Sequence, residues 1–227
     1  MFRYETHLHT RLTSACSIFE PQEIVDKYTR LGYAGVFVTD HFLNGNTTVP
    51  QELSWERRIS RFCEGYRFVK KAAEGKLDVF FGFEYSYYGT DFLVYGLEEE
   101  WLLNHPEIME MRVSEFCLFA RSEGGLVIQA HPYREANYID HIRLFPSHVD
   151  GMEIINANRD ERTNGLAKIL NEAYNLLPFA GSDIHGKKQT ALAGMEFKSK
   201  ISSGKEFVAR VLKGDGTPFT TADKEQL

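Results

Sequence analysis

Two histidines near the start of the chain, His7 and His9, have the spacing of a pair of metal ligands. The residues around them, 2–8, predict a strand, whose period of two puts both imidazoles on one face and turns Leu8 to the opposite layer. Neutral imidazole is a common ligand of zinc, iron and manganese. A motif this short also arises by chance, so the interpretation depends on where the other potential ligands lie.

Further ligand types follow four later apolar runs of the sequence. The side chains that end these runs are Asp40 and His41 after residues 36–39, Glu84 after 79–83, His131 after 126–130, and Asp183 and His185 after 179–182. In a parallel α/β barrel the loops that leave the carboxyl ends of the strands share one face, where active-site residues collect. Because the chain has only 8 histidines, this recurrence favours a metal site over chance.

Together, these motifs resemble the PHP family of metal-dependent phosphoesterases, named for polymerase and histidinol phosphatase. The segments that carry the resemblance follow the family's order and are His7-Leu8-His9-Thr10, Thr39-Asp40-His41, Gly82-Phe83-Glu84, Ala130-His131-Pro132 and Gly181-Ser182-Asp183-Ile184-His185. They extend over nearly the whole chain. The resemblance implies an α/β fold, a distorted (β/α)7-type barrel, in which residues 1–227 form a single domain.

The expected elements alternate between strands and helices, as such a barrel requires. Apolar runs predict strands at 2–8, 35–39, 77–85, 126–130, 149–155 and 178–182, with 92–96 as hairpin partner of 77–85 and a last short strand near 218–221. Helices are predicted at 20–31, 54–75, 106–123, 160–175 and 204–212. Three glutamates at 98–100 are expected in a solvated turn. The tyrosines of 85–91 fit a pocket wall and equally a pleated surface on which they pack.

Composition restricts the class of protein. A length of 227 residues suits one barrel domain with a sizeable core. The net charge of -6 argues against an extended nucleic-acid surface, although metal ions could supply the local charge for a small nucleotide. The three cysteines have no CxxC spacing, which is typical of a reducing cytosol. Neither a secretory leader nor an apolar run of about 18 residues is visible, so we expect a soluble, cytoplasmic protein without a membrane partner.

The resemblance also implies a role for each ligand. The residues that match the family's first metal site are His7, His9, Glu84 and Asp183. Those that match the second site are His131 and again Glu84, which would bridge the two ions. Those that match the third site are His41 and His185. Asp40 is interpreted mainly as a carboxylate that orients one of these imidazoles. The implied cofactors are two or three divalent transition metal ions: zinc, manganese or iron. They would activate a hydroxide and hold the attacking and leaving oxygens, which makes Glu84, Asp183 and His131 the candidate catalytic residues.

The sequence departs from the family's pattern at two places. Many relatives have an aspartate or histidine ligand a few residues after the first motif, where Cys16 is the nearest ligand-capable residue here. A thiolate at that place would favour zinc or iron over manganese, and the alternative is a small buried cysteine. Relatives also commonly have a histidine in the strand after Glu84, where Asp91 stands here. This leaves the number of metals open between two and three.

Three arginines follow motifs at the face expected to be open. They are Arg11, Arg134 and Arg159, and a guanidinium suits bidentate contact with phosphate. Any one of them is individually compatible with a solvated charge, but the set predicts at least one phosphate contact. His141 and His148 match no motif and are interpreted as ordinary histidines.

The function that these features favour is metal-dependent hydrolysis of a phosphate monoester or a short nucleotide phosphoester, with a small phosphorylated substrate. One alternative is a metal-binding regulatory or structural PHP domain without catalysis, against which the nearly complete ligand set argues. Another is an amidohydrolase-type barrel, which also begins with two histidines of this spacing. That class often uses a carbamylated lysine as the bridging ligand, and here Glu84 occupies the bridging position.

Overall fold

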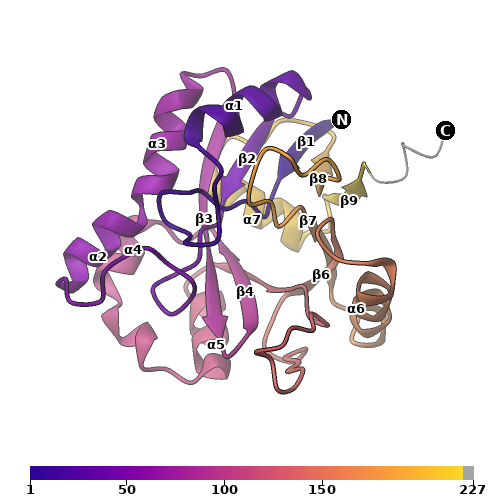
Figure 1. Ribbon diagram of the computed structural model, residues 1–227. Helices are drawn as coiled ribbons and strands as arrows, with labels where there is room; N and C mark the ends of the chain where they lie inside the picture. Colours follow the sequence, from indigo (N-terminus) through magenta and orange to yellow (C-terminus); the bar gives the residue numbers. More distant parts are fainter. Residues whose placement is uncertain (222–227) are drawn as a thin grey trace.

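The strands form one curved sheet that wraps into a nearly closed barrel (Figure 1). The computed structural model describes residues 1–221, and within them the strands are β1 (Phe2–Glu5), β2 (Gly35–Val38), β3 (Asp78–Tyr87), β4 (Thr90–Tyr95), β5 (Leu126–Ala130), β6 (Gly151–Asn156), β7 (Leu177–Gly181), β8 (Ala193–Phe197) and β9 (Thr217–Thr220). Their order across the sheet is β7-β6-β5-β4-β3-β2-β1-β8-β9. The predicted α/β barrel is confirmed.

Strand direction decides which side chains meet. β1, β2 and β3 run parallel, and so do β5, β6 and β7. β4 is antiparallel to both of its neighbours, β3 and β5, so the two groups of three strands point the same way. The carboxyl ends of these six strands therefore share one end of the barrel. The amino end of β4 lies at the same end, which is how the predicted β3–β4 hairpin delivers Asp91 to it.

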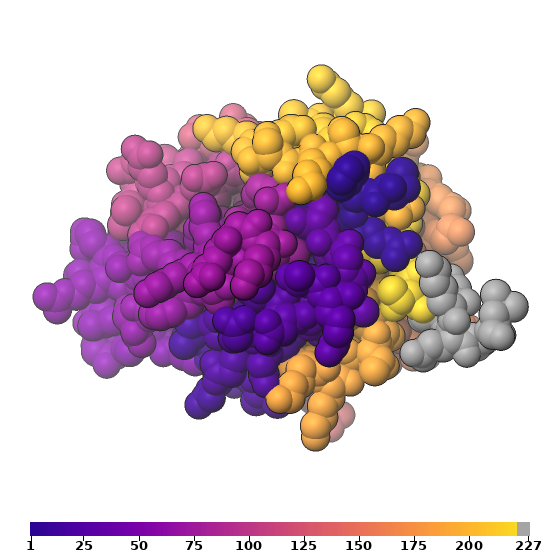
Figure 2. Space-filling view, turned by 90° about the horizontal axis from the view of Figure 1, so that it is seen from above, coloured from indigo at the N-terminus to yellow at the C-terminus, as the bar shows by residue number. Residues whose placement is uncertain are grey.

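The barrel is closed by segments that lie far apart in the sequence. Leu8, just beyond β1, forms an isolated parallel bridge with Ile184, just beyond β7. The N–H of His9 donates to the carbonyl of Ile184 (3.0 Å), and the N–H of Ile184 donates to the carbonyl of His7 (3.2 Å). On the edge of β1 that faces away from β2, β8 pairs antiparallel, and Figure 2 shows the indigo N-terminal residues beside yellow and orange ones from the last quarter of the chain.

A buried carboxylate, Glu5, reinforces this closure. It accepts hydrogen bonds from the backbone N–H groups of His7 (3.0 Å) and Ser182 (3.0 Å) and from the hydroxyl of Tyr28 (2.6 Å). One side chain thus joins β1, the segment after β7 and helix α1 (Pro21–Arg30). The strand predicted at 2–8 ends at Glu5, because beyond it the backbone bonds to this carboxylate and to Ile184 rather than to a regular strand ladder.

Helices cover the outside of the barrel, and α7 lies behind the strands in the view of Figure 1. Beside α1 they are α2 (Trp55–Phe62), α3 (Glu64–Ala73), α4 (Glu99–Asn104), a 3-10 turn (Pro106–Met109), α5 (Val113–Ser122), α6 (Glu161–Ala173) and α7 (Gly204–Leu212). Phe207 of α7 points into the barrel, where its ring centroid lies 4.3 Å from that of Phe37 and 5.3 Å from that of Tyr95. Within residues 1–221 no helix has the length and apolar character needed to cross a bilayer.

Three predicted elements differ in detail. The helix expected at 54–75 is broken at Cys63 into α2 and α3, which lets Gly65 pack so closely on Asp40 that a Cβ would lie 2.3 Å from its Oδ2. The helix expected at 106–123 is a 3-10 turn followed by α5, because Arg112 is extended and its N–H is capped by Glu115. The glutamates at 98–100 open α4 instead of forming a turn, since acids are favourable in the first turn of a helix.

Candidate metal centre

Five histidines and three acidic residues meet at the end of the barrel where the six parallel strands terminate. His7 and His9 follow β1, His41 follows β2, Glu84 lies in β3, Asp91 is the second residue of β4, His131 follows β5, and Asp183 and His185 follow β7. All of them except His185 are buried. The structure therefore brings together ligands that are up to 178 residues apart in the sequence (185 − 7).

Glu84 occupies the middle of this group. Its Oε1 lies 3.3 Å from Nε2 of His7 and 3.2 Å from Nε2 of His131. Its Oε2 lies 3.4 Å from Nε2 of His9 and 2.7 Å from Nδ1 of His41. Each carboxylate oxygen thus faces two imidazoles, which is the arrangement of a bridging ligand.

Asp183 faces the same space from β7. Its Oδ1 lies 3.6 Å from Nε2 of His7 and 3.5 Å from Nε2 of His9. Burial opposes ionisation, but His7 and His9 hold the pKa of Asp183 well below its usual range. The backbone of Asp183 is left-handed (φ 50°), as is that of His131 (φ 27°). Such non-glycine conformations are strained and cluster at functional sites.

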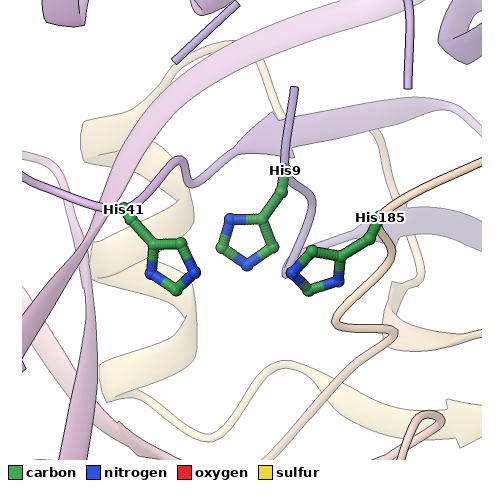
Figure 3. Close-up of side chains that lie close together, drawn as sticks. All are labelled: His9, His41 and His185. Atoms are coloured by element: carbon green, nitrogen blue, oxygen red, sulfur yellow. The ribbon is translucent and has the colours of Figure 1, made fainter. Parts of the chain in front are cut away.

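Three of the five imidazoles, those of His9, His41 and His185, are stacked at one side of the centre (Figure 3). The ring of His9 lies 4.4 Å from that of His41 and 4.4 Å from that of His185. Burial, together with its neighbours His41 and His185, holds the pKa of His9 well below its usual value. Burial raises the pKa of the Cys16 thiol, but hydrogen bonds with His185 and His41 lower it more strongly, to about 6. The structure thus places Cys16 beside two of the three imidazoles.

A buried glutamate that the sequence interpretation missed, Glu153, orients two ligands at once. Its Oε1 lies 2.8 Å from Nδ1 of His7, and its Oε2 accepts the backbone N–H of His131 (2.9 Å). A carboxylate only accepts, so His7 carries its proton on Nδ1 and directs the Nε2 lone pair into the centre. The available signal was an acid inside the run 151–155 of the predicted strand, where its neighbours Met152 and Ile154 are apolar.

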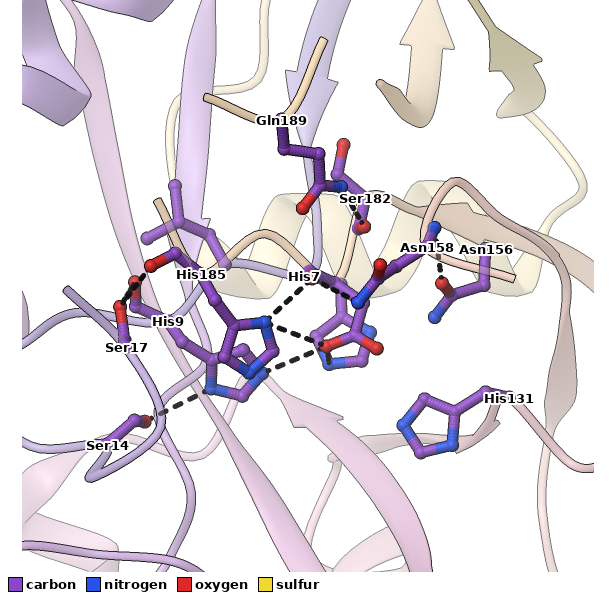
Figure 4. A network of polar contacts seen from close by, with 12 residues as sticks. His7, His9, Ser14, Ser17, His131, Asn156, Asn158, Ser182, His185 and Gln189 are labelled. Atoms are coloured by element: carbon purple, nitrogen blue, oxygen red, sulfur yellow. Dashed lines mark hydrogen bonds and ion pairs between the residues drawn. The ribbon is translucent and has the colours of Figure 1, made fainter. Parts of the chain in front are cut away.

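Asp40 acts on the centre through Ser14. The Ser14 hydroxyl donates a hydrogen bond to Asp40 Oδ1 (2.7 Å) and lies 3.1 Å from Nδ1 of His9 (Figure 4). Because its hydrogen points to Asp40, the Ser14 oxygen accepts a hydrogen bond from the Nδ1–H group of His9, which leaves Nε2 of His9 unprotonated. Thr10 donates to Asp40 from its N–H (2.6 Å) and its hydroxyl (2.7 Å). Burial raises the pKa of Asp40 to about 6 against these hydrogen bonds. The structure places Asp40 behind His9, where it orients the imidazole, and Ser14 is a second residue that the motifs did not reveal.

The three candidate arginines have different positions. Arg134 donates to Asp91 (2.9 Å), which lies 3.9 Å from Nε2 of His131. Arg159 lies 3.4 Å from Asp183 Oδ2. Arg11 is not brought to the centre: its exposed guanidinium pairs with Glu20, because Thr10 is tied to Asp40 and the next residue points outward. His141 is likewise at the surface, beside Arg143.

Several buried atoms of this centre have no hydrogen-bond partner among the described residues. They include Nε2 of His7 and Nε2 of His9, and also Nδ1 of His41 and Oε2 of Glu84, which lie 2.7 Å apart without the geometry of a hydrogen bond. An unsatisfied buried polar atom costs about 1–3 kcal/mol, so four that face one space require a common partner. The donor set of imidazole and carboxylate suits a divalent transition metal ion. Four overlapping groups have ligand atoms within 4.8 Å of one another: His7–His9–Glu84, His7–His131–Asp183, Glu84–Asp91–His131 and His9–His41–His185.

A cavity of about 850 Å³ opens onto this centre. Its lining includes five candidate ligands, Cys16, His41, Asp91, Asp183 and His185, and two of the arginines, Arg134 and Arg159. The loop segment 44–46, Ser86 and Gly89 also line it, together with aromatic and thioether side chains: Tyr85, Tyr87, Tyr88, Tyr138, Met109 and Met111. The tyrosines of the β3–β4 hairpin, for which the sequence left two interpretations open, thus contribute to a pocket wall.

No protein-family model and no curated protein sequence matches this chain. Solved structures match its fold. A two-domain protein from Bacteroides vulgatus, described as containing a predicted PHP-like metal-dependent phosphoesterase, matches with a TM-score of 0.71 at 15% identity. The match covers 96% of this chain and 64% of that one, so the chain spans less than two thirds of this neighbour.

Two further neighbours are covered almost completely. A protein from Bifidobacterium adolescentis, described as a proposed metal-dependent phosphoesterase, has a TM-score of 0.58 and 14% identity, over 94% of this chain and 96% of that one. An amidohydrolase from Chromobacterium violaceum with bound sulfate and no metal has a TM-score of 0.57 and 14% identity, over 98% and 99%. Identities this low establish the fold, not the function. The resemblance first seen in the motifs is confirmed at that level: the chain has the barrel fold of PHP-type metal-dependent phosphoesterases.

Proposed function

We propose that this protein is a metal-dependent hydrolase of phosphate monoesters or short nucleotide phosphoesters. The observation that carries the proposal is the position of the Glu84 carboxylate, which faces a ring nitrogen of four different histidines. Three of these four nitrogens, those of His7, His9 and His41, have no hydrogen-bond partner among the described residues. Such a constellation fits cations better than it fits any packing role.

The overlapping groups suggest which residues would hold which ion. His7, His9, Glu84 and Asp183 fit one cation, and Glu84 with His131 fits a second, with Asp91 beside it. His9, His41 and His185 fit a third, with Cys16 beside it. When bound, zinc, manganese or iron ions supply positive charge to a phosphoryl group and make water more acidic.

The protein's own residues would bind and orient the ester. Arg134 and Arg159 line the cavity and already contact carboxylates of the centre, so a phosphoryl group beside Asp183 lies within reach of a guanidinium. Buried side chains surround the ligands and keep bulk water from all but the cavity side. The Chromobacterium violaceum neighbour binds sulfate, an anion with the tetrahedral shape of a phosphoryl group.

The amidohydrolase alternative rests on the spacing of His7 and His9 and on that same neighbour's name. The paired arginines favour a phosphoester over an amide, because a neutral amide gains less from two guanidinium groups than a dianion does. A non-catalytic metal-binding domain would retain the ligands but would have no need of the open cavity.

The test is hydrolysis of p-nitrophenyl phosphate by the purified protein before and after removal of metal with a chelator. We expect activity that the chelator abolishes and that zinc, manganese or iron restores. A matched p-nitroanilide serves as the amide substrate. Hydrolysis of the anilide alone would favour the amidohydrolase, and a full metal complement without hydrolysis of any ester would favour the non-catalytic domain.

A further inference from the structure

The cavity has more room than a phosphoryl group needs. Its volume of about 850 Å³ lies near the top of the range of about 300–1,000 Å³ for pockets that hold organic ligands. The part of the lining without candidate ligands is contributed by the β3–β4 hairpin, by the loops after β2 (44–46) and β5, by Arg159 and by Met109 and Met111. The remainder of the substrate would therefore contact this part.

Two tyrosines of this lining are unusually exposed. The relative exposure of Tyr88 is 75% and that of Tyr138 is 71%, although both rings are large and apolar over most of their area. Arg143 lies over the ring of Tyr88 (5.7 Å) and Arg134 over that of Tyr138 (5.9 Å). Tyr87 adds an edge-to-face contact with Tyr88, at 4.9 Å and 83°. The rings are thus held by their neighbours without being buried.

The segments that carry the tyrosines are tied together and to the metal centre. Arg143 donates to the carbonyl of Tyr88 (3.1 Å), and Arg134 donates to the carbonyl of Gly89 (3.2 Å) as well as to Asp91 (2.9 Å). Gly89, with φ 81°, packs so closely on Ile139 that a Cβ would lie 2.7 Å from it. Arg134 therefore contacts both Asp91 of the metal centre and the aromatic wall, by which we mean Tyr88 and Tyr138.

We propose that the site takes a phosphoester whose leaving group carries a planar aromatic ring, which packs against Tyr88 and Tyr138. Aromatic rings bind one another in offset or edge-to-face arrangements, and the thioethers of Met109 and Met111 adapt to a ring edge. This inference rests on the proposed function and gives its substrate a chemical class. A simple aryl group and a nucleobase share this chemistry.

Binding of non-hydrolysable phosphonates to the metal-loaded protein, measured by calorimetry, tests the inference without turnover. Phenylphosphonate is compared with cyclohexylphosphonate, which has a ring of similar size but no π system. We expect phenylphosphonate to bind about three- to tenfold more tightly. The phosphonate analogue of adenosine monophosphate separates the two sources: tighter binding than phenylphosphonate assigns a nucleobase, and weaker binding assigns a simple aryl group.

Variants locate the preference. Tyr88→Leu and Tyr138→Leu should each reduce the ratio of phenyl to cyclohexyl affinity, whereas Tyr88→Phe and Tyr138→Phe should retain it because the ring remains. Tyr174→Leu is the matched control, since Tyr174 is also exposed (53%) but does not line the cavity. Equal affinities for the two phosphonates, or a ratio that neither leucine variant changes, would overturn the inference.

The inference and the proposed function fail in different ways. If phenyl phosphate and cyclohexyl phosphate are hydrolysed with equal kcat/KM, the protein is a phosphoesterase and the aromatic preference is wrong. If phenylphosphonate binds preferentially but neither ester is hydrolysed with any of the three metals, the aromatic wall stands and the proposed hydrolysis is wrong.

Discussion

His7, His9 and His185 each have their Nδ1 atom engaged by an acceptor of the protein: Glu153, Ser14 and the carbonyl of Asp183. These contacts fix the tautomer and leave each Nε2 with a free lone pair. Burial lowers the pKa of His7, but Glu153, Asp183 and Glu84 raise it well above its usual value. Protons and cations therefore compete for the same nitrogen, and metal binding should release protons.

Glu84→Ala should abolish hydrolysis while the fold persists. The substitution removes the carboxylate that faces four imidazoles, and the several kcal/mol of charge stabilisation that a metal site provides correspond to at least a hundredfold in rate. Kinetics with p-nitrophenyl phosphate and the circular dichroism spectrum measure the two effects. Glu115→Gln, at an exposed position, is the control. Activity within tenfold of the unsubstituted protein would contradict a bridging role for Glu84.

Cys16 should be the reactive thiol of the metal-free protein. Its thiolate forms above a pKa of about 6 because His185 and His41 stabilise it against the effect of burial, so the rate of alkylation should rise with pH through that value and level off by pH 7. Cys63 and Cys117 are buried, and burial raises the pKa of both, so they should not react in the folded state. Iodoacetamide labelling followed by mass spectrometry measures all three.

Metal should protect the Cys16 thiol if it is a ligand. We expect saturating zinc to slow alkylation at pH 7 by more than tenfold, and Cys16→Ala to lower the metal content per chain without emptying the group around Glu84. If the alkylation rate has its pH midpoint near 8.5, the value of an ordinary thiol, and Cys16→Ala leaves the metal content per chain unchanged, Cys16 is not a ligand.

At the scale of elements, close backbone approach positions the ligands. Gly181, the last residue of β7, lies where a Cβ would be 2.4 Å from Cβ of His7 and 2.7 Å from Oε1 of Glu153. Both neighbours are fully buried. The distance between β7 and the segment after β1 is therefore set by the absence of a side chain at this position.

Gly181→Ala should destabilise the protein by about 1–3 kcal/mol, as overpacking of a core does. It should also reduce metal affinity, because His7 and Glu153 must both move away from the new methyl group. Urea unfolding of the metal-free protein measures the first effect and metal titration the second. Gly165→Ala in α6 is the matched control: nothing lies within 4 Å of its Cβ position, and alanine is favoured over glycine in a helix by about 1 kcal/mol. Equal stability of the two variants would contradict the packing argument.

The strands and their ligand-bearing ends could be predicted from the sequence because an apolar run and its polar end are local features. The residues that were missed act over long separations: Glu153 bonds to His7 across 146 residues and Glu5 to Ser182 across 177. Nothing near Glu153 or Glu5 in the sequence identifies those partners. Arg11 was expected at the open face because it follows the first motif, but the hydrogen bonds of Thr10 to Asp40 turn the chain at that point. The break at Cys63 depends in the same way on the packing of Gly65 against Asp40.

Across the whole molecule, the ligands link the first strand of the barrel to the seventh. Binding to the folded state alone stabilises it by about 2.7 kcal/mol at a free metal concentration of 100 times Kd. For a chain of this size each kcal/mol corresponds to about 2–4 °C. We therefore expect chelation to lower the Tm by roughly 5–10 °C, as measured by calorimetry at a fixed protein concentration.

Asp183→Asn should reproduce much of this loss, because a neutral amide is a far weaker ligand than a carboxylate. The difference in Tm between the variant and the unsubstituted protein should be present with metal and should largely disappear with chelator. Asp26→Asn, on the exposed side of α1, is the control and should melt like the unsubstituted protein in both conditions. If the variant still binds a full metal complement and chelation leaves the Tm unchanged, closure of the centre by the segment after β7 is wrong.

The bridge between Leu8 and Ile184 has a consequence for how the chain is made. Ribosomes add about 5–20 residues per second, so roughly 10–35 seconds pass between the synthesis of His7 and that of Asp183. During this interval β1 can pair with β2, but neither β8 nor the segment after β7 yet exists. Throughout it, the two N-terminal histidines lack the partners that the segment after β7 supplies. The complete set of candidate ligands can therefore assemble only after translation has passed residue 185.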